Sequence, residues 1–505
     1  MGAANPLIIY GPSGEAVSTP ETRRLSAVQR QRDAVVARFD SAQTTDENAK
    51  HWAAADYLGP NAELNAATRR LLRSRARYEC ANNSYMAGIV RTLANDTIGT
   101  GPALFITDDR YSKDDASEVE TRYWEWCLSV DKPGKLRKMR LAKCRDGETF
   151  AKTFSNPRAS TPVQFDFQPF EADHVAAVSI DNPMSSLLDG LIIDDYGNVI
   201  AYNVLDEHPG ETGTAMYGRS ELIAAEFIIH LFHSDRPGQY RGCPEVLSTL
   251  PLWAQMRRYT LSVLNASESA ANVSWIMQTQ QPPSEMALGE SFDAIQTRRG
   301  MGMVLPGGYT MGQLKAEQPT TTYPQFKREI VSEAARGTGS GVPYGVAAGD
   351  FSSYNFTSGR LDTRPYSKGI RIERGAWESK ACSPLFRGWF EEARRIPGYL
   401  PKVASQGLPR HEWRWDGEDF IDPNKEIDAA SARVSNGFSS FDDECNRLGT
   451  DRETVWRKNA QALGLTEQEY AMRMADKIFG AQVASSSQPT PEPQPFNQDN
   501  GGQPQ

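Results

Sequence analysis

The residue types that most often do chemistry, His, Cys, Asp and Glu, are scattered along this chain. Its six Cys residues are at least 17 positions apart, so it has no CxxC zinc or redox pair. His230 and His233 lie three positions apart on a strand-like stretch, where they would point to opposite faces and could not share a metal ion. Adjacent carboxylates such as Asp194 and Asp195 are typical of turns and solvated surfaces. We therefore predict no catalytic residue, no metal ligand and no cofactor.

Motifs for nucleotide binding and hydrolysis are also missing. Gly11-Pro-Ser-Gly14 lacks the lysine of a P-loop, and Gly337-Thr-Gly-Ser-Gly341 has the wrong spacing for a dinucleotide site. There is no HExxH zinc motif and no GxSxG nucleophile elbow. These absences favour a structural component over an enzyme. A hydrolase that uses paired acidic residues is the alternative from another class.

The balance of charged residues further limits the functions that the chain can have. The 505 residues include 64 Asp and Glu against 55 Lys and Arg, a formal net charge of −9. Because phosphate neutralisation supplies most nonspecific affinity for DNA, an acidic chain is poorly suited to gripping nucleic acid broadly. The balance still allows a local basic strip, or a protein that surrounds DNA without holding it.

The first residues show no secretory signal, and no apolar stretch approaches the 18 residues of a membrane span. Scattered Cys residues are typical of free thiols in a reducing compartment. We therefore expect no membrane partner. We also expect the protein to be made and kept in a cytoplasm unless a larger particle carries it out.

The elements that would position any site are helices first and strands later. A charged amphipathic helix is predicted at 21–39, and helical patterns cover 61–98, 117–130 and 136–145. A Gly/Pro stop signal follows the first of these patterns at 99–102. Runs rich in β-branched and aromatic residues then predict strands at 149–154, 163–170, 191–194, 199–204 and 227–232. This mixture predicts an α+β fold.

The longest predicted helix covers 244–278, with Pro244 near its start and many Ala and Ser residues in its second half. Such small residues suit close packing between helices. Pro282 and Pro283 end this helix. A strand-like run follows at 301–305, and a second helix is predicted at 324–336.

A Gly-dense segment, 337–349, precedes a long helical stretch, 357–392, that we expect to be interrupted near Pro365 and Pro384. Residues 411–415 alternate like a strand. The C-terminal part predicts helices at 423–436, 439–448, 450–463 and 466–479. Residues 481–505 are mostly Ser, Gln, Pro, Asn and Gly, which predicts disorder.

Several sequence blocks occur in a distinctive order along the chain. The most specific is His230 followed by Arg236-Pro-Gly-Gln-Tyr-Arg-Gly-Cys-Pro244. The other blocks are Tyr85 to Gly101 with its Ile-Gly-Thr-Gly end, Arg145-Asp-Gly-Glu148, Gly190 to Tyr202 with His208-Pro209, Val342-Pro343, Ser353-Tyr354-Asn355 and Asp422-Pro-Asn-Lys-Glu426. Together they resemble the lambda-type portal proteins of tailed phages, and the resemblance runs from about residue 61 to 460.

The resemblance implies a portal fold that forms a ring, usually of twelve identical subunits or of thirteen without a capsid, at one capsid vertex. DNA would enter and leave through its centre. The implied regions are an N-terminal arm (1–60), a wing (61–243 and 359–422), two stem helices (244–278 and 324–343), a clip (279–323), a tunnel loop (344–358), a helical crown (423–480) and a disordered tail (481–505).

The same resemblance implies residues that face the DNA channel. Asp350 at the tip of the tunnel loop would give the bore an acidic collar, which repels phosphate so that DNA slides. Lys327, Arg328 and Arg336 on the second stem helix would supply weak opposite contacts. The remaining candidates belong to the same loop: Phe351, Ser352, Tyr354 and Asn355. Phe351 and Tyr354 are expected to serve more in packing than as wedges into DNA.

The implied partners are other copies of the chain, the terminase large subunit, a head-completion or tail adaptor, major capsid and scaffold proteins, and double-stranded DNA. The implied location is the portal vertex of the virion, with assembly in the host cytoplasm. A passive head–tail adaptor is the remaining alternative. An adaptor would be smaller and would lack the helix–clip–helix insertion predicted at 244–336.

Overall fold

The computed structural model describes residues 50–51, 53–176, 187–211, 219–272, 276–279, 309–312, 322–417 and 423–480. The chain divides into two compact units, Met1–Ala62 and Glu63–Gln505. The expected helix 21–39 and tail 481–505 lie outside the described residues, as does most of the expected clip. α2 (Pro60–Glu63) spans the unit boundary, and all later elements belong to the second unit.

Two Asn caps divide the helical pattern predicted for 61–98. α3 (Ala66–Asn82) begins where the Asn65 side chain accepts a hydrogen bond from the Thr68 amide (3.0 Å). α4 (Ser84–Ile98) begins where the Asn83 side chain accepts from the Tyr85 and Met86 amides (3.1 and 3.3 Å). Because these caps satisfy amides that a helix start leaves unpaired, Asn83 ends one helix and starts another.

α5 (Lys113–Ser129) and α6 (Lys132–Asp146) confirm the helices predicted at 117–130 and 136–145. Between α4 and α5 the chain forms β1 (Ala103–Ile106), which pairs antiparallel with β11 (His411–Arg414). The strand predicted at 411–415 is thereby confirmed. Its partner β1 was not predicted, because its sequence Ala-Leu-Phe-Ile is apolar at every position and does not alternate.

Two antiparallel sheets follow. β2 (Glu148–Ser155) lies between β3 (Phe165–Phe170) and β8 (Ile228–Phe232). The second sheet has the order β4 (Leu187–Leu188), β5 (Leu191–Ile193), β6 (Val199–Leu205) and β7 (Ser220–Ala224). All five predicted strands are present. β7 was not predicted because its first two residues, Ser220 and Glu221, are not strand formers. The mixed α+β prediction is confirmed.

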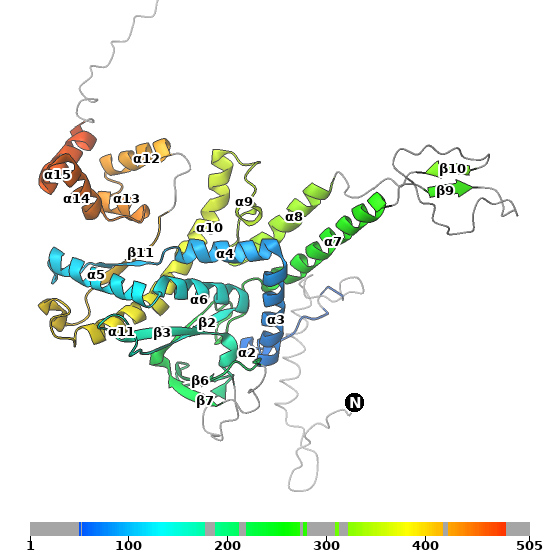
Figure 1. The fold of residues 1–505 in the computed structure, drawn as a ribbon, viewed down its shortest axis with the longest axis horizontal. Coiled ribbons are helices and arrows are strands. Elements are labelled where there is room, and N and C mark those ends of the chain that lie inside the picture. Colours follow the sequence, from blue (N-terminus) through cyan, green and yellow to red (C-terminus); the bar gives the residue numbers. More distant parts are fainter. Residues whose placement is uncertain are drawn as a thin grey trace, which may run out of the picture. The chain divides into compact units, whose positions relative to one another are not determined.

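α7 (Leu250–Asn272) and α8 (Tyr323–Arg336) form a helical pair and run side by side (Figure 1). The helix predicted at 244–278 is wrong at both ends. A 3₁₀ turn at Leu247–Thr249 precedes α7, and β9 (Ile276–Thr279) follows it and pairs with β10 (Tyr309–Gly312). The predicted strand 301–305 lies outside the described residues.

The beginning of the predicted stem helix is not helical because its residue Glu245 binds α6 instead. The Glu245 amide donates to the Cys144 carbonyl (3.0 Å), and the Glu245 carboxylate pairs with Arg140 (3.0 Å) and Lys143 (2.8 Å). At the other stem helix, α8 matches the predicted 324–336. Residues 337–343, which the implied stem region also included, form turns instead of helix.

The expected tunnel loop 344–358 is partly helical. α9 (Tyr344–Ala348) occupies its start, and α10 (Phe356–Trp377) its last residues. The expected break near Pro365 is wrong, because Pro365 lies inside α10, on an exposed turn where water can satisfy the carbonyl that loses its partner. Near Pro384 the helix does change, through a π-helical turn at Glu378–Cys382 into α11 (Ser383–Ala393).

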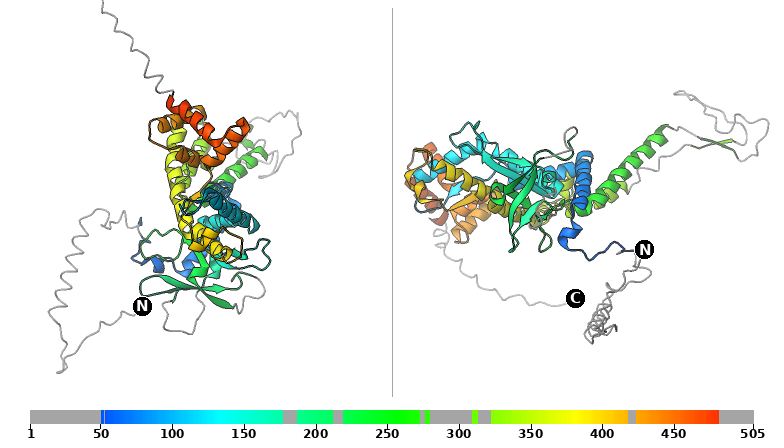
Figure 2. Two further views of the ribbon diagram at one scale, coloured as in Figure 1. Left: turned by 90° about the vertical axis from the view of Figure 1, so that its left-hand side faces the viewer. Right: turned by 90° about the horizontal axis from the view of Figure 1, so that it is seen from below.

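The four predicted C-terminal helices are confirmed as α12 (Pro423–Ser435), α13 (Phe441–Arg447), α14 (Arg452–Leu463) and α15 (Glu467–Ala475). They are the orange-to-red group in Figure 2. Capping boxes at Ser440 and Thr466 start α13 and α15. A π-helical turn, Asp476–Gly480, follows α15.

Three hydrophobic clusters form the core. The first joins α5, α11 and β2 through side chains that include Tyr123, Trp126 and Phe386. The second joins α4, α7, α8, α9 and α10, and includes Trp253 and Ala335. The third lies between the two sheets. The second cluster therefore fixes both helices of the α7–α8 pair, and the segment after them, to the body of the unit. All six Cys residues are free thiols.

Candidate channel segment

The residues predicted to face a channel belong to α8, α9 and the turn between α9 and α10. α8 ends at Arg336, and the Val342 amide donates back to the Ala335 carbonyl (3.1 Å). The buried Thr338 hydroxyl donates to the Ala334 carbonyl (2.9 Å). These bonds close the Gly-dense turn onto the end of α8, and α9 starts after Pro343.

Two aromatic rings cover the backbone of α9. A Cβ atom at Gly345 would lie 2.8 Å from the Phe351 ring and 3.0 Å from the Tyr354 ring, so only glycine allows this close approach. The two rings also pack against each other, with centroids 5.9 Å apart. Phe351 and Tyr354 therefore pack on α9, although Phe351 is still more than half exposed.

Tyr354 also carries a polar connection. Its hydroxyl accepts a hydrogen bond from the Gly345 amide (3.1 Å) and donates to the Asp362 carboxylate on α10. Asn355 caps α10 by accepting from the Ser358 amide (2.8 Å). The turn 349–355 is thus tied to the helix before it and to the helix after it.

Asp350 forms a local turn instead of projecting freely. Its carboxylate accepts from the Ser352 amide (3.0 Å) and from the Tyr344 hydroxyl (3.4 Å). Hydrogen bonds from the Ser352 hydroxyl and amide lower the pKa of Asp350, so the group is ionised at neutral pH. The charge required for an acidic collar is therefore present, and the nearby Arg328 partly offsets it.

The three predicted cations have different surroundings. Arg328 donates to the Ser353 hydroxyl (2.7 Å) and lies 4.8 Å from the Tyr344 ring centroid, so it belongs to the same group as Asp350. Lys327 lies 5.2 Å from the Tyr85 ring centroid on α4. Arg336 is exposed, and its guanidinium lies near the Gly341 backbone. Apart from Lys327 and Arg336, the predicted residues gather at one short segment, 344–355 with Arg328.

The sequence interpretation missed a buried ionic junction. Glu148 starts β2 and is fully buried, and its carboxylate accepts hydrogen bonds from Arg241 (2.7 to 3.0 Å), the Gly242 amide (3.1 Å) and His230 (3.2 Å). Burial alone would raise the pKa of Glu148, but the Arg241 charge and these bonds hold it well below its usual value. Burial lowers the pKa of His230.

The signal for this junction was present in the sequence. Glu148 closes the Arg145-Asp-Gly-Glu148 block, and Arg241 lies in the Arg236–Pro244 block, which was the most specific part of the resemblance. A Cβ atom at Gly147 would lie 2.3 Å from the Cys243 backbone, so the two blocks meet at their glycines too. The motifs therefore mark a buried joint between the sheet and the start of α7, and no surface site.

Glu171, Asp173 and His208 offer three potential metal-ligand atoms within 4.8 Å of one another. The two carboxylates already have a cationic partner, because Arg77 forms ion pairs with Asp173 (2.8 Å) and Glu171 (3.2 Å). The His208 Nδ1 atom accepts from the Gly210 amide (3.0 Å), which in the neutral ring leaves the proton on Nε2, the atom that faces the carboxylates. This arrangement suits an ion-pair network better than a metal centre.

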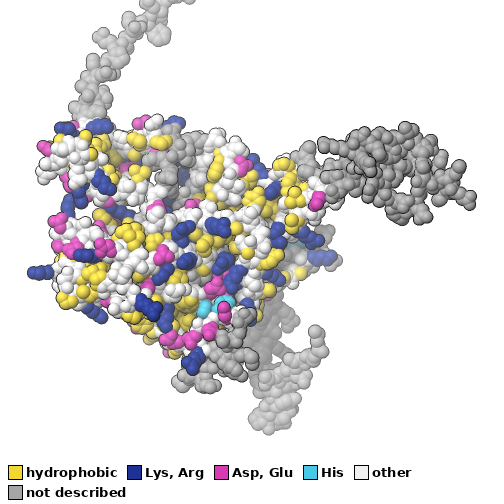
Figure 3. All heavy atoms as spheres, viewed as in Figure 1, with side chains coloured by type: hydrophobic (Ala, Val, Ile, Leu, Met, Phe, Trp, Pro, Cys, Tyr) yellow, Lys and Arg dark blue, Asp and Glu magenta, His cyan; other side chains and the backbone are white. Residues whose placement is uncertain are grey.

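No helix in the described parts of the chain is both long and apolar enough to cross a lipid bilayer. On the face seen in Figure 3, Lys and Arg side chains are interspersed with acidic and hydrophobic ones, with no broad basic field. This mixture of charges agrees with the net charge of −9.

Several known proteins are similar to this chain in sequence. The probable portal protein of Halomonas phage phiHAP-1 is 24% identical over 425 residues, covering 77% of this chain and 79% of that protein. Portal protein B of Escherichia phage lambda is 20% identical over 351 residues, covering 63% of this chain and 65% of that protein. The neck of an empty gene transfer agent particle shows a TM-score of 0.44 and 16% identity, over 75% of this chain and 93% of that one.

The sequence pattern of one protein family matches residues 45–374, which is about two thirds of the chain. The match covers the α7–α8 pair, the segment 344–355 and the buried Glu148–Arg241 junction. The family is structural and non-enzymatic, so the hydrolase alternative is set aside. The chain belongs to the lambda family of phage portal proteins.

Proposed function

We propose that twelve copies of this chain form a ring at one vertex of a phage capsid, and that DNA passes through the ring during packaging and ejection. The family match over residues 45–374 carries this proposal. The anchored segment 344–355 supports it, because a conduit needs loops that keep their shape while DNA slides past. Asp350 carries the negative charge that would repel phosphate there.

Within this ring we assign the regions that the resemblance implies, with helix bounds taken from the structure. α7 and α8 would form the stem, residues 279–323 the clip, and residues 344–358 the tunnel loop. The wing would consist of 61–243 and 359–422, and the crown of 423–480. The clip would dock the terminase large subunit and later a head-completion or tail adaptor, while capsid and scaffold proteins would surround the ring. Assembly would take place in the host cytoplasm.

The native mass of the purified full-length chain, with negative-stain images of the same sample, tests this proposal. Twelve chains of 56.0 kDa give about 670 kDa, and the images should show rings with a central hole. Rings of thirteen would keep the function and change the number. A chain that stays monomeric both alone and with its scaffold protein would contradict the proposal and leave the passive adaptor.

A further inference from the structure

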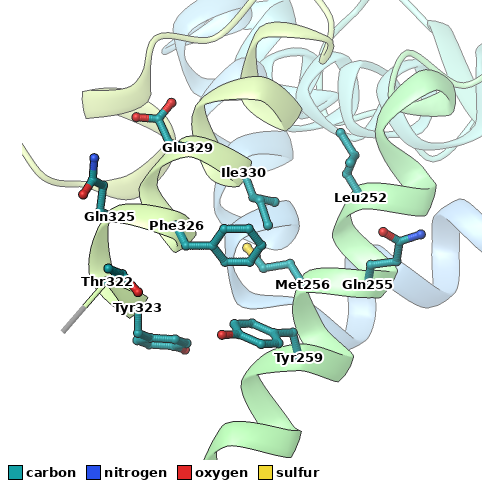
Figure 4. A pocket seen from close by; sticks show the side chains of 10 residues that line it. All are labelled: Leu252, Gln255, Met256, Tyr259, Thr322, Tyr323, Gln325, Phe326, Glu329 and Ile330. Atoms are coloured by element: carbon teal, nitrogen blue, oxygen red, sulfur yellow. The ribbon is translucent and has the colours of Figure 1, made fainter. Parts of the chain in front are cut away.

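An apolar groove of about 650 Å³ lies between α7 and α8 (Figure 4). Phe326, Ile330 and Met256 point toward one another inside it. Tyr259 lies beside Tyr323 at one end, and Phe326 packs edge-on against Tyr259 with ring centroids 5.4 Å apart. Phe326 is 49% exposed, so a large aromatic surface is left open to solvent. Such a surface on a helix pair needs a partner to cover it.

Of the acidic side chains on α8, Glu329 lines the groove and Glu333 lies one turn further along the same helix face. Glu329 and Glu333 follow Phe326 at spacings of three and seven residues, which places all three on one face of the helix. Both carboxylates have no ion-pair partner in the parts of the chain that the structure describes, and both are exposed. The groove therefore offers an apolar floor with a negative border.

A second helix carries the complementary pattern. One face of α10 carries three cations and two aliphatic side chains, each three or four residues from another member of the set. We call this face the basic stripe, and it consists of Leu361, Arg364, Lys368, Arg371 and Ile372. Leu361 is 64% and Ile372 67% exposed. Within the described residues, none of these three cations has an ion-pair partner. Tyr366 and Ile370, on the opposite face of α10, are buried in the second hydrophobic cluster.

We propose that the α7–α8 groove of one copy binds the basic stripe of a second copy. The proposal rests on the ring proposed above and identifies the surfaces that join its subunits. Apolar side chains meet an apolar floor and cations meet an acidic border, so shape and charge match. Because groove and stripe are different surfaces of the same chain, each copy can bind one neighbour on each side. Such head-to-tail contacts form a ring when the rotation between neighbouring copies closes.

The stripe's composition favours a protein partner over DNA. Nonspecific affinity for phosphate comes mainly from cations, whereas this stripe also exposes two aliphatic side chains, Leu361 and Ile372. Burying Leu361 and Ile372 against Phe326 would remove these apolar surfaces from water. DNA as the occupant remains an outcome that the experiment separates.

Two charge-reversed variants of the full chain test the contact. The groove variant carries Glu329→Lys and Glu333→Lys, and the stripe variant carries Arg364→Glu and Lys368→Glu. Each variant alone would place like charges against each other, so its rings should be lost at low salt. In an equal mixture, the basic groove of the groove variant can bind the acidic stripe of the stripe variant. The unchanged acidic groove of the stripe variant can bind the unchanged basic stripe of the groove variant. The mixture should therefore form rings in which the variants alternate.

The readout is native mass with negative-stain imaging, and the control carries Lys138→Glu and Glu226→Lys, exposed residues outside both surfaces. Loss of rings in each variant with recovery in the mixture supports the proposal, and recovery also shows that both variants fold. Variants that form rings alone, or a mixture that forms none, overturn it. If the stripe variant forms rings but binds duplex DNA more weakly than wild type, DNA is the occupant. Absence of wild-type rings both alone and with the scaffold protein contradicts the proposed function itself.

Discussion

The buried contact between Glu148 and Arg241 ties the start of β2 to the segment that leads into α7. Glu148 is fully buried and Arg241 nearly so, and Arg241 also donates to the carbonyls of Val175 (3.2 Å) and Asp189 (2.6 Å). A buried ion pair adds little net stability when it is intact, because desolvation offsets the attraction. Removing one partner is costly, because the other charge is left buried and uncompensated. The junction should therefore tolerate single changes poorly.

Replacing Arg241 with Ala should destabilise the fold by at most about 3–5 kcal/mol, the usual cost of stranding a buried charge, because Arg73 (3.6 Å) and Arg69 (4.0 Å) still lie beside Glu148. The measurement is the unfolding midpoint in urea, followed by tryptophan fluorescence. The matched control is Lys152→Ala, which breaks the exposed pair of Lys152 with Glu221 (2.6 Å) and should cost at most about 1 kcal/mol. Equal losses in the two variants would contradict the role assigned to the junction.

At the scale of elements, the sequence predicts helices and strands well where local pattern decides them. The four C-terminal helices and the five strands predicted between 149 and 232 are all present, because their apolar spacing and caps act over a few residues. The start of α7 was mispredicted because a distant contact decides it: Glu245 binds Arg140 and Lys143 on α6. Likewise, no local pattern shows that Phe351 and Tyr354 pack on Gly345.

The anchoring of the turn 349–355 gives the prediction at this scale. Tyr354→Phe removes the hydroxyl that links the buried Gly345 amide to Asp362. A buried amide left unpaired costs about 1–3 kcal/mol, so α9 and the turn should open more often. Amide hydrogen exchange across 344–355 should therefore quicken by about tenfold or more, since about 1.4 kcal/mol corresponds to one decade.

Tyr196→Phe is the control for this change. Tyr196 is 92% exposed and its hydroxyl has no partner among the described residues, so its loss should leave exchange across 344–355 as in wild type. Unchanged exchange in the Tyr354→Phe protein would show that the ring packing alone holds the turn. In that case the hydroxyl bridge would have no part in keeping a channel loop in place.

At the scale of the whole molecule, the three hydrophobic clusters contain no residue from 423–480. Polar contacts connect the C-terminal helices to the rest of the unit, including Arg414 with Asp451 (2.7 Å) and Lys113 with Glu453 (2.7 Å). These pairs lie where α5, β1, β11 and α14 meet. Attachment there depends on charge more than on apolar burial, so pH should affect it.

Glu120 on α5 is the titrating group at this meeting point. Its carboxylate accepts from the Ile106 amide (2.7 Å), and burial raises its pKa to about 7, with Asp451 and Glu453 acting in the same direction and Arg414 opposing. The folded chain therefore holds a proton on Glu120 that the unfolded chain releases above pH 4.5, the ordinary pKa of a Glu side chain. Stability from this group is present below pH 4.5, falls as pH rises toward 7, and then levels off.

The Glu120→Gln variant should remove this dependence, because the amide stays neutral and can still accept from Ile106. Between pH 5 and pH 8, wild type should lose stability relative to the variant, with a slope of at most about 1.4 kcal/mol per pH unit below pH 7. Urea unfolding at several pH values measures the difference, and Glu118→Gln, on an exposed part of the same helix, should leave the wild-type slope unchanged. If the free energies of unfolding of wild type and Glu120→Gln changed in parallel with pH, the pH response would come from a group other than Glu120. A steeper fall in wild type would show that a single half-buried carboxyl group, at the place where α5 and α14 meet, lowers the stability of the fold as it ionises.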